Sequence, residues 1–390
     1  MSAAAYIVAA LRTAGGKRGG RLSGWHPADL SAQVIDALLA RTGADPAMVD
    51  DVVWGCVSQV GQQASNIARN AVLSSRLPES VPGTSVDRQC GSSQQALHFA
   101  AQAVMSGSMD VVIAGGVESM SSVPMFSPNA LAERAGLGGY VGERMAARYP
   151  GVVFSQFAGA EQIARNYGFS RAQLDAYALQ SHQRAAQARA HWAEQIVPVA
   201  ARNVDGELGE LHTEDEGVRA NATLEGIASV KLLQEGGVLS AANASQICDG
   251  ASAVMVVSER ALQTLGVAPL ARVHHMSVMG HDPVIMLEAP IPATQRALAK
   301  CGLRLHDIGL YEVNEAFASV PLAWQQALDA DPARLNAEGG AIALGHPLGA
   351  SGTRLATSLV HALRRTGARY GLQTMCEGGG MANVTVFERC

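Results

Sequence analysis

Two stretches that lie far apart in this sequence share one arrangement of turn, helix and strand. Residues 92–106 and 351–365 carry apolar side chains at helical spacing, and each stretch follows a glycine-bearing turn. Each predicted helix leads to an apolar strand, at 111–114 and 370–375, and each strand closes on glycines. This internal repeat predicts two similar halves whose strand ends face one shared site.

Outside its middle, the chain alternates apolar strands with helices. Residues 27–39 predict an amphipathic helix, because apolar side chains lie one turn apart and a proline stands near the start. Further strands are expected at 6–11, 52–57, 252–257, 272–278 and 309–313, and further helices at 64–73, at 293–301 and from Ala316. This alternation predicts an α/β protein, and 390 residues with 48% hydrophobic content suffice for one large core or two packed domains.

The middle of the chain has a different texture. Methionine, serine, proline and glycine dominate residues 119–128, a pair of charged helices is expected across 158–192, and residues 203–220 are acidic and rich in turn formers. We interpret this region as a large insertion. The predicted division is an N-terminal half of residues 1–118 and 247–269, an inserted loop domain of residues 119–246, and a C-terminal half of residues 270–390.

Charge and cysteine usage argue against several classes of function. A net charge of -5 and a pI near 6.1 argue against nucleic-acid binding. The apolar N-terminus is short and lacks a basic leader, and no stretch approaches the length of a membrane span, so we expect neither a signal peptide nor membrane association. The cysteines form no CxxC pattern and no cluster with histidine at metal spacing, which predicts no metal, no disulfide framework and a cytoplasmic protein.

Cys90 stands at the mouth of the helix predicted at 92–106. Unpaired backbone N–H groups and the helix dipole favour a negative charge at such a position, so a thiolate there would be stabilised and nucleophilic. The alternative is a small buried side chain, which is what most unpaired cysteines are. The local sequence leaves both interpretations open.

His346 is framed by Gly345 and Pro347, ahead of the helix predicted at 351–365. The turn fixes the backbone and leaves the imidazole uncrowded, which favours a functional histidine over a structural one. Gly345 and Gly349 also suit a phosphate cradle, but the chain has neither the GxGxxG nor the GxxxxGK[ST] pattern.

Cys376 and Asn314 each follow a predicted strand. The glycines at 378–380 let backbone N–H groups approach a carbonyl oxygen near Cys376, because no Cβ intervenes. The alternative for Cys376 is an ordinary core cysteine. Asn314 stands at the carboxyl end of the strand at 309–313, where α/β folds place their sites, and its alternative is a helix cap.

These stretches, in this order and spacing, resemble the thiolase family over essentially the whole chain. The further motifs that carry the resemblance are Arg12-Thr13, Gly24, Gly115-Gly116-Val117-Glu118-Ser119-Met120-Ser121, Asn243-Ala244-Ser245, Asp249-Gly250-Ala251 and Asn314-Glu315-Ala316-Phe317. The resemblance implies a thiolase-like α/β fold of two similar mixed-sheet halves, packed as αβαβα layers with a large inserted loop domain.

The chemistry implied by the resemblance is ping-pong acyl transfer on coenzyme A thioesters. Cys90 looks like the nucleophile, His346 like the group that takes its proton, and Cys376 like the acid/base at the α-carbon of the acetyl unit. Two oxyanion sites are implied as well. One consists of His346 and a water held by Asn314, and the other of the backbone N–H groups of Cys90 and Gly378.

The resemblance also implies the partners. Arg219 looks like the arginine that meets the nucleotide end of CoA, and Ser245 like the serine that contacts its pantetheine, although each suits a solvated loop equally well. CoA is then a substrate, with no permanently bound cofactor and no metal. A homodimer or homotetramer is expected.

Two departures from the family pattern bear on the type of thiolase. Gln156-Phe157 stands where many thiolases have Met-Gly, so the acyl pocket is expected to differ from that of short-chain enzymes, and Glu338 stands where asparagine is usual. Residues 91–95 resemble the degradative branch, which favours a 3-ketoacyl-CoA thiolase of β-oxidation. The alternatives are a biosynthetic acetoacetyl-CoA thiolase and a non-catalytic relative that binds acyl-CoA or lipid; a ketoacyl-synthase type is disfavoured, because Asn314 stands where those enzymes have a histidine.

Overall fold

The computed structural model describes residues 3–390. Its strands are β1 (Tyr6–Thr13), β2 (Gly16–Lys17), β3 (Asp51–Gly55), β4 (Gly83–Val86), β5 (Val111–Ser119), β6 (Ile196–Val197), β7 (Val199–Arg202), β8 (Leu208–His212), β9 (Cys248–Val257), β10 (Ala271–Gly280), β11 (Leu310–Val313), β12 (Tyr370–Glu377) and β13 (Met381–Arg389). Its α-helices are α1 (Pro27–Thr42), α2 (Ile67–Ser74), α3 (Ser92–Met105), α4 (Ser127–Arg134), α5 (Glu143–Arg148), α6 (Gln156–Asn166), α7 (Arg171–Ala188), α8 (Leu224–Ala228), α9 (Glu259–Leu265), α10 (Pro290–Cys301), α11 (Ser319–Leu328), α12 (Ala341–Leu344) and α13 (Ser351–Thr366).

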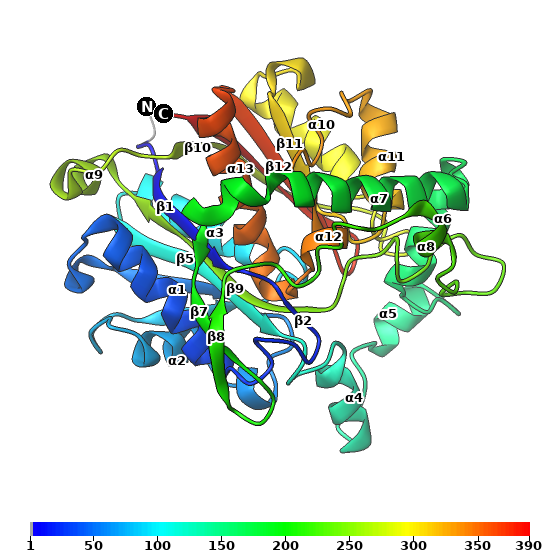
Figure 1. Cartoon of the computed structure of the whole chain (residues 1–390), viewed down its shortest axis with the longest axis horizontal. Helices are drawn as coiled ribbons and strands as arrows, with labels where there is room; N and C mark the ends of the chain where they lie inside the picture. The colour runs from blue at the N-terminus through cyan, green and yellow to red at the C-terminus, as the bar shows by residue number, and fades with distance from the viewer. Residues whose placement is uncertain (1–2) are drawn as a thin grey trace.

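The strand pairing repeats from the two ends of one continuous path, β11-β12-β13-β10-β1-β9-β5-β3-β4 (Figure 1). From β4, the first two pairings are parallel and the next two are antiparallel. From the other end, a bridge between Leu335 and Tyr311 and the pairing of β11 with β12 are parallel, and the next two pairings are antiparallel. The two similar mixed-sheet halves are therefore confirmed, and they join through a short antiparallel pairing of β1 with β10.

Helices α3 and α13 form a layer between the two halves. Leu97 and Ala100 of α3 belong to the same buried cluster as Leu359 and Leu363 of α13. Helices α1 and α2 contact the N-terminal strands and share their core cluster, whereas α10 contacts β10 and β13. The predicted order of layers, αβαβα, is therefore confirmed.

The contact between α3 and α13 leaves no room for a side chain at Gly352. A Cβ at this position would lie 2.1 Å from the backbone nitrogen of Gln94. We expect Gly352→Ala to lower the free energy of unfolding by about 1–3 kcal/mol, because overpacking displaces neighbours in a close-packed core. Chemical denaturation measures this loss against Gly280→Ala, where a Cβ meets nothing within 4 Å. Equal stability of the two variants would contradict a rigid contact between the helices.

Some elements differ from the sequence-based expectation. The strand expected at 111–114 continues through Gly115 and Gly116 to Ser119. A glycine has no side chain, so another segment of the chain can approach the strand closely at this point. A Cβ on Gly116 would lie 2.1 Å from the carbonyl oxygen of Gly349. The helix expected from Ala316 begins at Ser319, and β13 has no counterpart among the predicted strands.

The insertion between β5 and β9 contains α4 to α8 and β6 to β8. The two helices expected across 158–192 are present as α6 and α7, and α7 begins with a capping box formed by Ser170 and Gln173. Helix α6 packs against α11 and α7 against α12, whereas α4 and α5 stand away from the sheets in Figure 1. The division into three domains stays a prediction. No helix within residues 3–390 combines the length and the apolar composition needed to cross a membrane.

Candidate active site

Cys90 lies in the turn between β4 and α3. The turn is held by its own hydrogen bonds: Gly91 N–H donates to the Arg88 carbonyl at 3.1 Å, and Arg88 N–H donates to Ser92 Oγ at 2.9 Å. Gln89 has a φ of 50°, a left-handed conformation that allows the reversal. Cys90 is partly exposed, at the start of a helix that has no side-chain cap. The predicted position at the mouth of a helix is confirmed.

His346 is buried in the turn that precedes α13, with only 4% of its surface exposed. Gly345 adopts a φ of 86°, and His346 N–H donates to the Gln246 carbonyl at 2.9 Å. Ser351 Oγ donates to the Pro347 carbonyl at 2.9 Å, so this oxygen must accept the hydrogen bond that it shares with His346 Nδ1. Nδ1 therefore carries the proton, and Nε2 presents a lone pair.

Cys90 and His346 are both neutral in the resting site. Burial is the largest cause that raises the pKa of the Cys90 thiol to about 12, and Glu377, in its ionised form, is the next largest. Burial and the positive charge of Arg354 lower the pKa of His346 to about 3. Burial thus opposes the stabilisation of a thiolate that the start of the helix would provide, and the expectation of a reactive thiolate stays a prediction. The thiol needs a base at the moment of reaction.

Asn314 lies beside His346, at the end of β11. Its backbone N–H donates to the Thr374 carbonyl at 3.1 Å, and its Nδ2 lies 3.3 Å from His346 Nε2. The Oδ1 atom is buried and accepts no hydrogen bond from the described residues. The alternative of a helix cap is wrong, because α11 begins only at Ser319 and has no side-chain cap. An unpaired amide oxygen at this point suits a bound water.

A buried carboxylate, Glu118, ties the turn after His346 to the N-terminal half. It accepts hydrogen bonds from the backbone N–H groups of Val57 and Ser58, from Gln63 Nε2 and from Gly349 N–H, at 2.8–3.0 Å. A lone carboxylate in the apolar β5 indicates pairing inside the protein, but the local sequence does not show with which groups.

A second buried carboxylate, Glu315, supports Asn314 from the next position. It accepts hydrogen bonds from Tyr177 Oη, Ser181 Oγ, Asn336 Nδ2 and the backbone N–H of Ile342. The bonds connect β11 to the inserted α7 and to the start of α12. The position of Asn314 therefore depends on contacts from three distant parts of the chain, none of which is visible in the local sequence.

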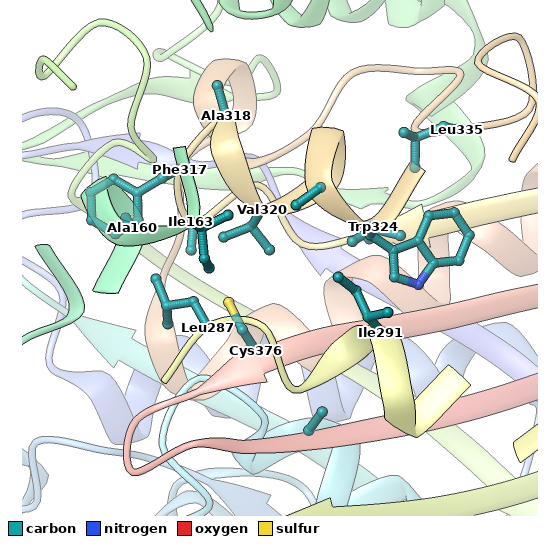
Figure 2. Packing of buried hydrophobic residues seen from close by; sticks show 14 of the residues in the cluster. Ala160, Ile163, Leu287, Ile291, Phe317, Ala318, Val320, Trp324, Leu335 and Cys376 are labelled. Atoms are coloured by element: carbon teal, nitrogen blue, oxygen red, sulfur yellow. The ribbon is translucent and has the colours of Figure 1, made fainter. Parts of the chain in front are cut away.

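Cys376 lies near the end of β12 and is fully buried. Figure 2 shows its sulfur facing an apolar cluster that includes Leu287 and Phe317. Burial raises the pKa of its thiol. Gly378 follows in a partly exposed turn, where a Cβ would lie 2.9 Å from the Gln89 side-chain oxygen. The Cys90 turn and the Cys376 turn are thus in contact.

The two predicted CoA contacts differ in their setting. Ser245 N–H donates to the Ala316 carbonyl at 2.9 Å, which places Ser245 beside the strand end that carries Asn314. Arg219 is exposed, and its backbone N–H donates to His182 Nδ1 on α7 at 3.2 Å. The structure brings Ser245 to the candidate site and leaves Arg219 on the surface.

The two departures from the family pattern have separate surroundings. The Phe157 ring is 37% exposed and meets the Phe317 ring edge to face at 5.6 Å, close to the strand end of Asn314. Glu338 forms an ion pair with Arg365 at the end of α13 and accepts a hydrogen bond from Trp192 Nε1 at 3.2 Å. Phe157 is therefore a candidate wall of the acyl pocket, whereas Glu338 fastens the far end of α13.

Two repeated mixed-sheet halves that share a middle layer of helices define a thiolase-like α/β fold. Residues 5–260 match the model of the thiolase N-terminal domain, and residues 267–389 match that of the thiolase C-terminal domain. The chain belongs to the thiolase family, and its enzyme class is acetyl-CoA C-acyltransferase.

Relatives and solved structures agree with this assignment. The chain is 52% identical over 389 residues to the steroid 3-ketoacyl-CoA thiolase FadA6 of Mycobacterium tuberculosis, covering 99% of this chain and 94% of the relative. It is 42% identical over 397 residues to the 3-ketoacyl-CoA thiolase FadA of Escherichia coli, covering 98% of each. Human mitochondrial 3-ketoacyl-CoA thiolase superposes with a TM-score of 0.89 and Bacillus anthracis acetyl-CoA acetyltransferase with 0.90, each at 34% identity over 100% of this chain and 99% of that chain.

Proposed function

We propose that this chain is a degradative thiolase, which uses CoA to cleave 3-ketoacyl-CoA into acetyl-CoA and a shortened acyl-CoA. Relatives that are 41–52% identical carry names of 3-ketoacyl-CoA thiolases. The observation that supports the mechanism is the contact between the Cys90 turn and the turn after Cys376, where a Cβ on Gly378 would lie 2.9 Å from the side-chain oxygen of Gln89. The CoA thioester is a substrate here, and no resident cofactor enters the reaction.

In the first half-reaction, His346 Nε2 takes the proton of Cys90, and the sulfur attacks the 3-keto carbon. The resulting oxyanion is stabilised by the new Nε2–H and by a water held at Asn314 Oδ1. The bond between C2 and C3 then breaks, and its electron pair passes to the acetyl-CoA enolate. Backbone N–H groups of Cys90 and Gly378 stabilise the enolate oxygen, while Cys376 gives its proton to C2.

In the second half-reaction, the Cys376 thiolate accepts the proton of the incoming CoA thiol. The CoA sulfur attacks the acyl group on Cys90, and the departing Cys90 sulfur recovers its proton from His346. Both cysteines and the imidazole return to their neutral forms, which matches the resting state favoured by burial. Protons and electron pairs therefore balance over one turnover.

The finer features belong to the same proposal. Arg219 meets the nucleotide end of CoA, and Ser245 meets the pantetheine next to the Asn314 strand end. The enzyme acts in the cytoplasm as a homodimer or homotetramer. The Phe157 ring lies against Phe317 where many thiolases have a Met-Gly pair, so the acyl pocket differs from that of short-chain acetoacetyl-CoA enzymes.

A thiolysis series tests the proposal against the biosynthetic alternative. We expect kcat/KM to be at least about tenfold higher for a long or ring-bearing 3-ketoacyl-CoA than for acetoacetyl-CoA, because each tenfold step needs about 1.4 kcal/mol of extra transition-state binding. Preference for acetoacetyl-CoA would instead favour the biosynthetic type. A third outcome is no turnover and no acetyl adduct after incubation with acetyl-CoA. It would favour the alternative that this chain is a non-catalytic relative that binds acyl-CoA or lipid.

A further inference from the structure

Glu377 is a buried carboxyl group in the candidate site that the proposed mechanism leaves unused. It follows Cys376 on β12, and successive strand residues point to opposite faces, so its side chain faces the Cys90 turn. It is fully buried, and neither carboxyl oxygen has a hydrogen-bond partner among the described residues. A Cβ on Gly91 would lie 1.9 Å from Glu377 Oε1, so this oxygen lies against the backbone next to Cys90.

The charges around this carboxyl leave it without a close counter-ion. Arg88, on the Cys90 turn, partly offsets the burial, but its Nη1 lies 3.7 Å from the Met381 sulfur and forms no ion pair within residues 3–390. Burial, and then the charge of Arg88, lower the pKa of His98 on α3 to about 3, so His98 adds no positive charge here. Burial also lowers the pKa of His275 on β10. Burial therefore dominates, and it raises the pKa of Glu377 to about 8.

We propose that Glu377 is a positioning residue of the acyl-transfer site, whose carboxyl stays protonated beside Cys90 and whose ionisation suppresses the reactivity of the Cys90 sulfur. The inference rests on the proposed function, in which Cys90 is the nucleophile. A neutral carboxyl adds no charge next to a sulfur that must become negative during the reaction. An ionised carboxyl at the same place opposes that charge.

The negative groups around Cys90 determine in which direction the ionisation of Glu377 changes the reactivity of the thiol. Other negative groups that act on Cys90 are Glu118 and Asp87, but Glu377 contributes the largest charge effect on its thiol pKa. Below pH 8 the carboxyl is neutral and exerts no Coulomb effect, whereas above pH 8 it disfavours the thiolate. Relative to a variant with an uncharged side chain at position 377, the enzyme should therefore show lower Cys90 reactivity only above pH 8.

Alkylation of Cys90 by iodoacetamide, followed by peptide mass mapping from pH 6.5 to pH 10, tests this without substrate. In the wild type we expect the rise of log rate with pH to flatten above pH 8. In Glu377→Gln the rise should continue, so that the variant matches the wild type at pH 6.5 and exceeds it about tenfold at pH 10, which is one pKa unit. Glu312→Gln is the matched control, because its carboxyl is also buried with a pKa raised to about 8 but does not act on Cys90.

A second variant keeps the inference testable if Glu377→Gln folds poorly. Arg88→Gln removes the charge that lowers the Glu377 pKa, so the flattening should move to higher pH. Identical profiles for wild type and Glu377→Gln, or a ratio that is constant at every pH, would overturn the inference. Acetyl-adduct formation is measured in parallel. If the adduct forms and the pH profiles of wild type and variant are the same, only the inference is contradicted. If the pH profiles differ and no adduct forms, only the proposed function is contradicted.

Discussion

Replacing Cys90 with alanine is expected to abolish acyl transfer, with a loss in kcat of about 10,000-fold or more, as removal of a covalent nucleophile commonly produces. Alanine has no atom that can bond the acyl group, so neither half-reaction has a route through the enzyme. The fold should be retained, because Cys90 is partly exposed and its turn is held by backbone and Ser92 hydrogen bonds. Thiolysis rates and intact mass after incubation with acetyl-CoA provide the measurement.

The matched control for this variant is Cys301→Ala at the end of α10, which removes another partly exposed cysteine. It should form the acetyl adduct at the wild-type rate. An adduct that persists in Cys90→Ala, or that maps to another cysteine, would show that Cys90 is not the nucleophile.

Cys376→Ala is expected to affect acyl transfer to Cys90 and cleavage of the carbon-carbon bond to different extents. Transfer of an acyl group from a simple acyl-CoA to Cys90 should persist with a much smaller loss, because the CoA sulfur can depart as a thiolate without the Cys376 proton, a free thiol having a pKa of about 8.5. Cleavage or formation of the carbon-carbon bond should fall by about 100- to 10,000-fold, the usual contribution of a general acid or base. The buried sulfur faces apolar side chains, which have no proton to give in its place.

The comparison requires two assays on the same preparation. Exchange of labelled CoA with acyl-CoA reports acyl transfer alone, and thiolysis of a 3-ketoacyl-CoA reports both steps. Cys56→Ala, another buried cysteine in the N-terminal half, controls for the loss of a core sulfur. Equal losses in both assays for Cys376→Ala would contradict its assignment as the acid and base.

The sequence predicts those parts of the fold whose signal is local. The helix at 92–106, the strand at 111–114 and their repeats at 351–365 and 370–375 carry apolar patterns that predict them. Strand β13 does not, because Asn383 and Thr385 interrupt its apolar residues while being buried. Those polar groups bond to Gln94, Gln95 and His98 on α3, so only the folded chain shows why they are tolerated inside.

In the candidate site, too, the local sequence indicates some features, whereas others depend on segments that are distant in the sequence. Glycine and proline around His346, and the helix after Cys90, indicate both residues from the sequence. Their ionisation does not follow from it, since the raised pKa of the Cys90 thiol comes from burial and from a carboxyl near the other end of the chain. The supporting carboxylates Glu118 and Glu315 are equally invisible locally, because their donors come from segments far away in sequence.

The repeated halves have a consequence for the order of events during synthesis. The turn that carries Cys90 belongs to the half that leaves the ribosome early, whereas the imidazole and the second sulfur emerge near the end of translation. Each half contributes one central helix to a shared middle layer, so neither half can complete that layer alone. If these residues have the proposed roles, a nascent polypeptide has no acyl-transfer activity until its last strands dock.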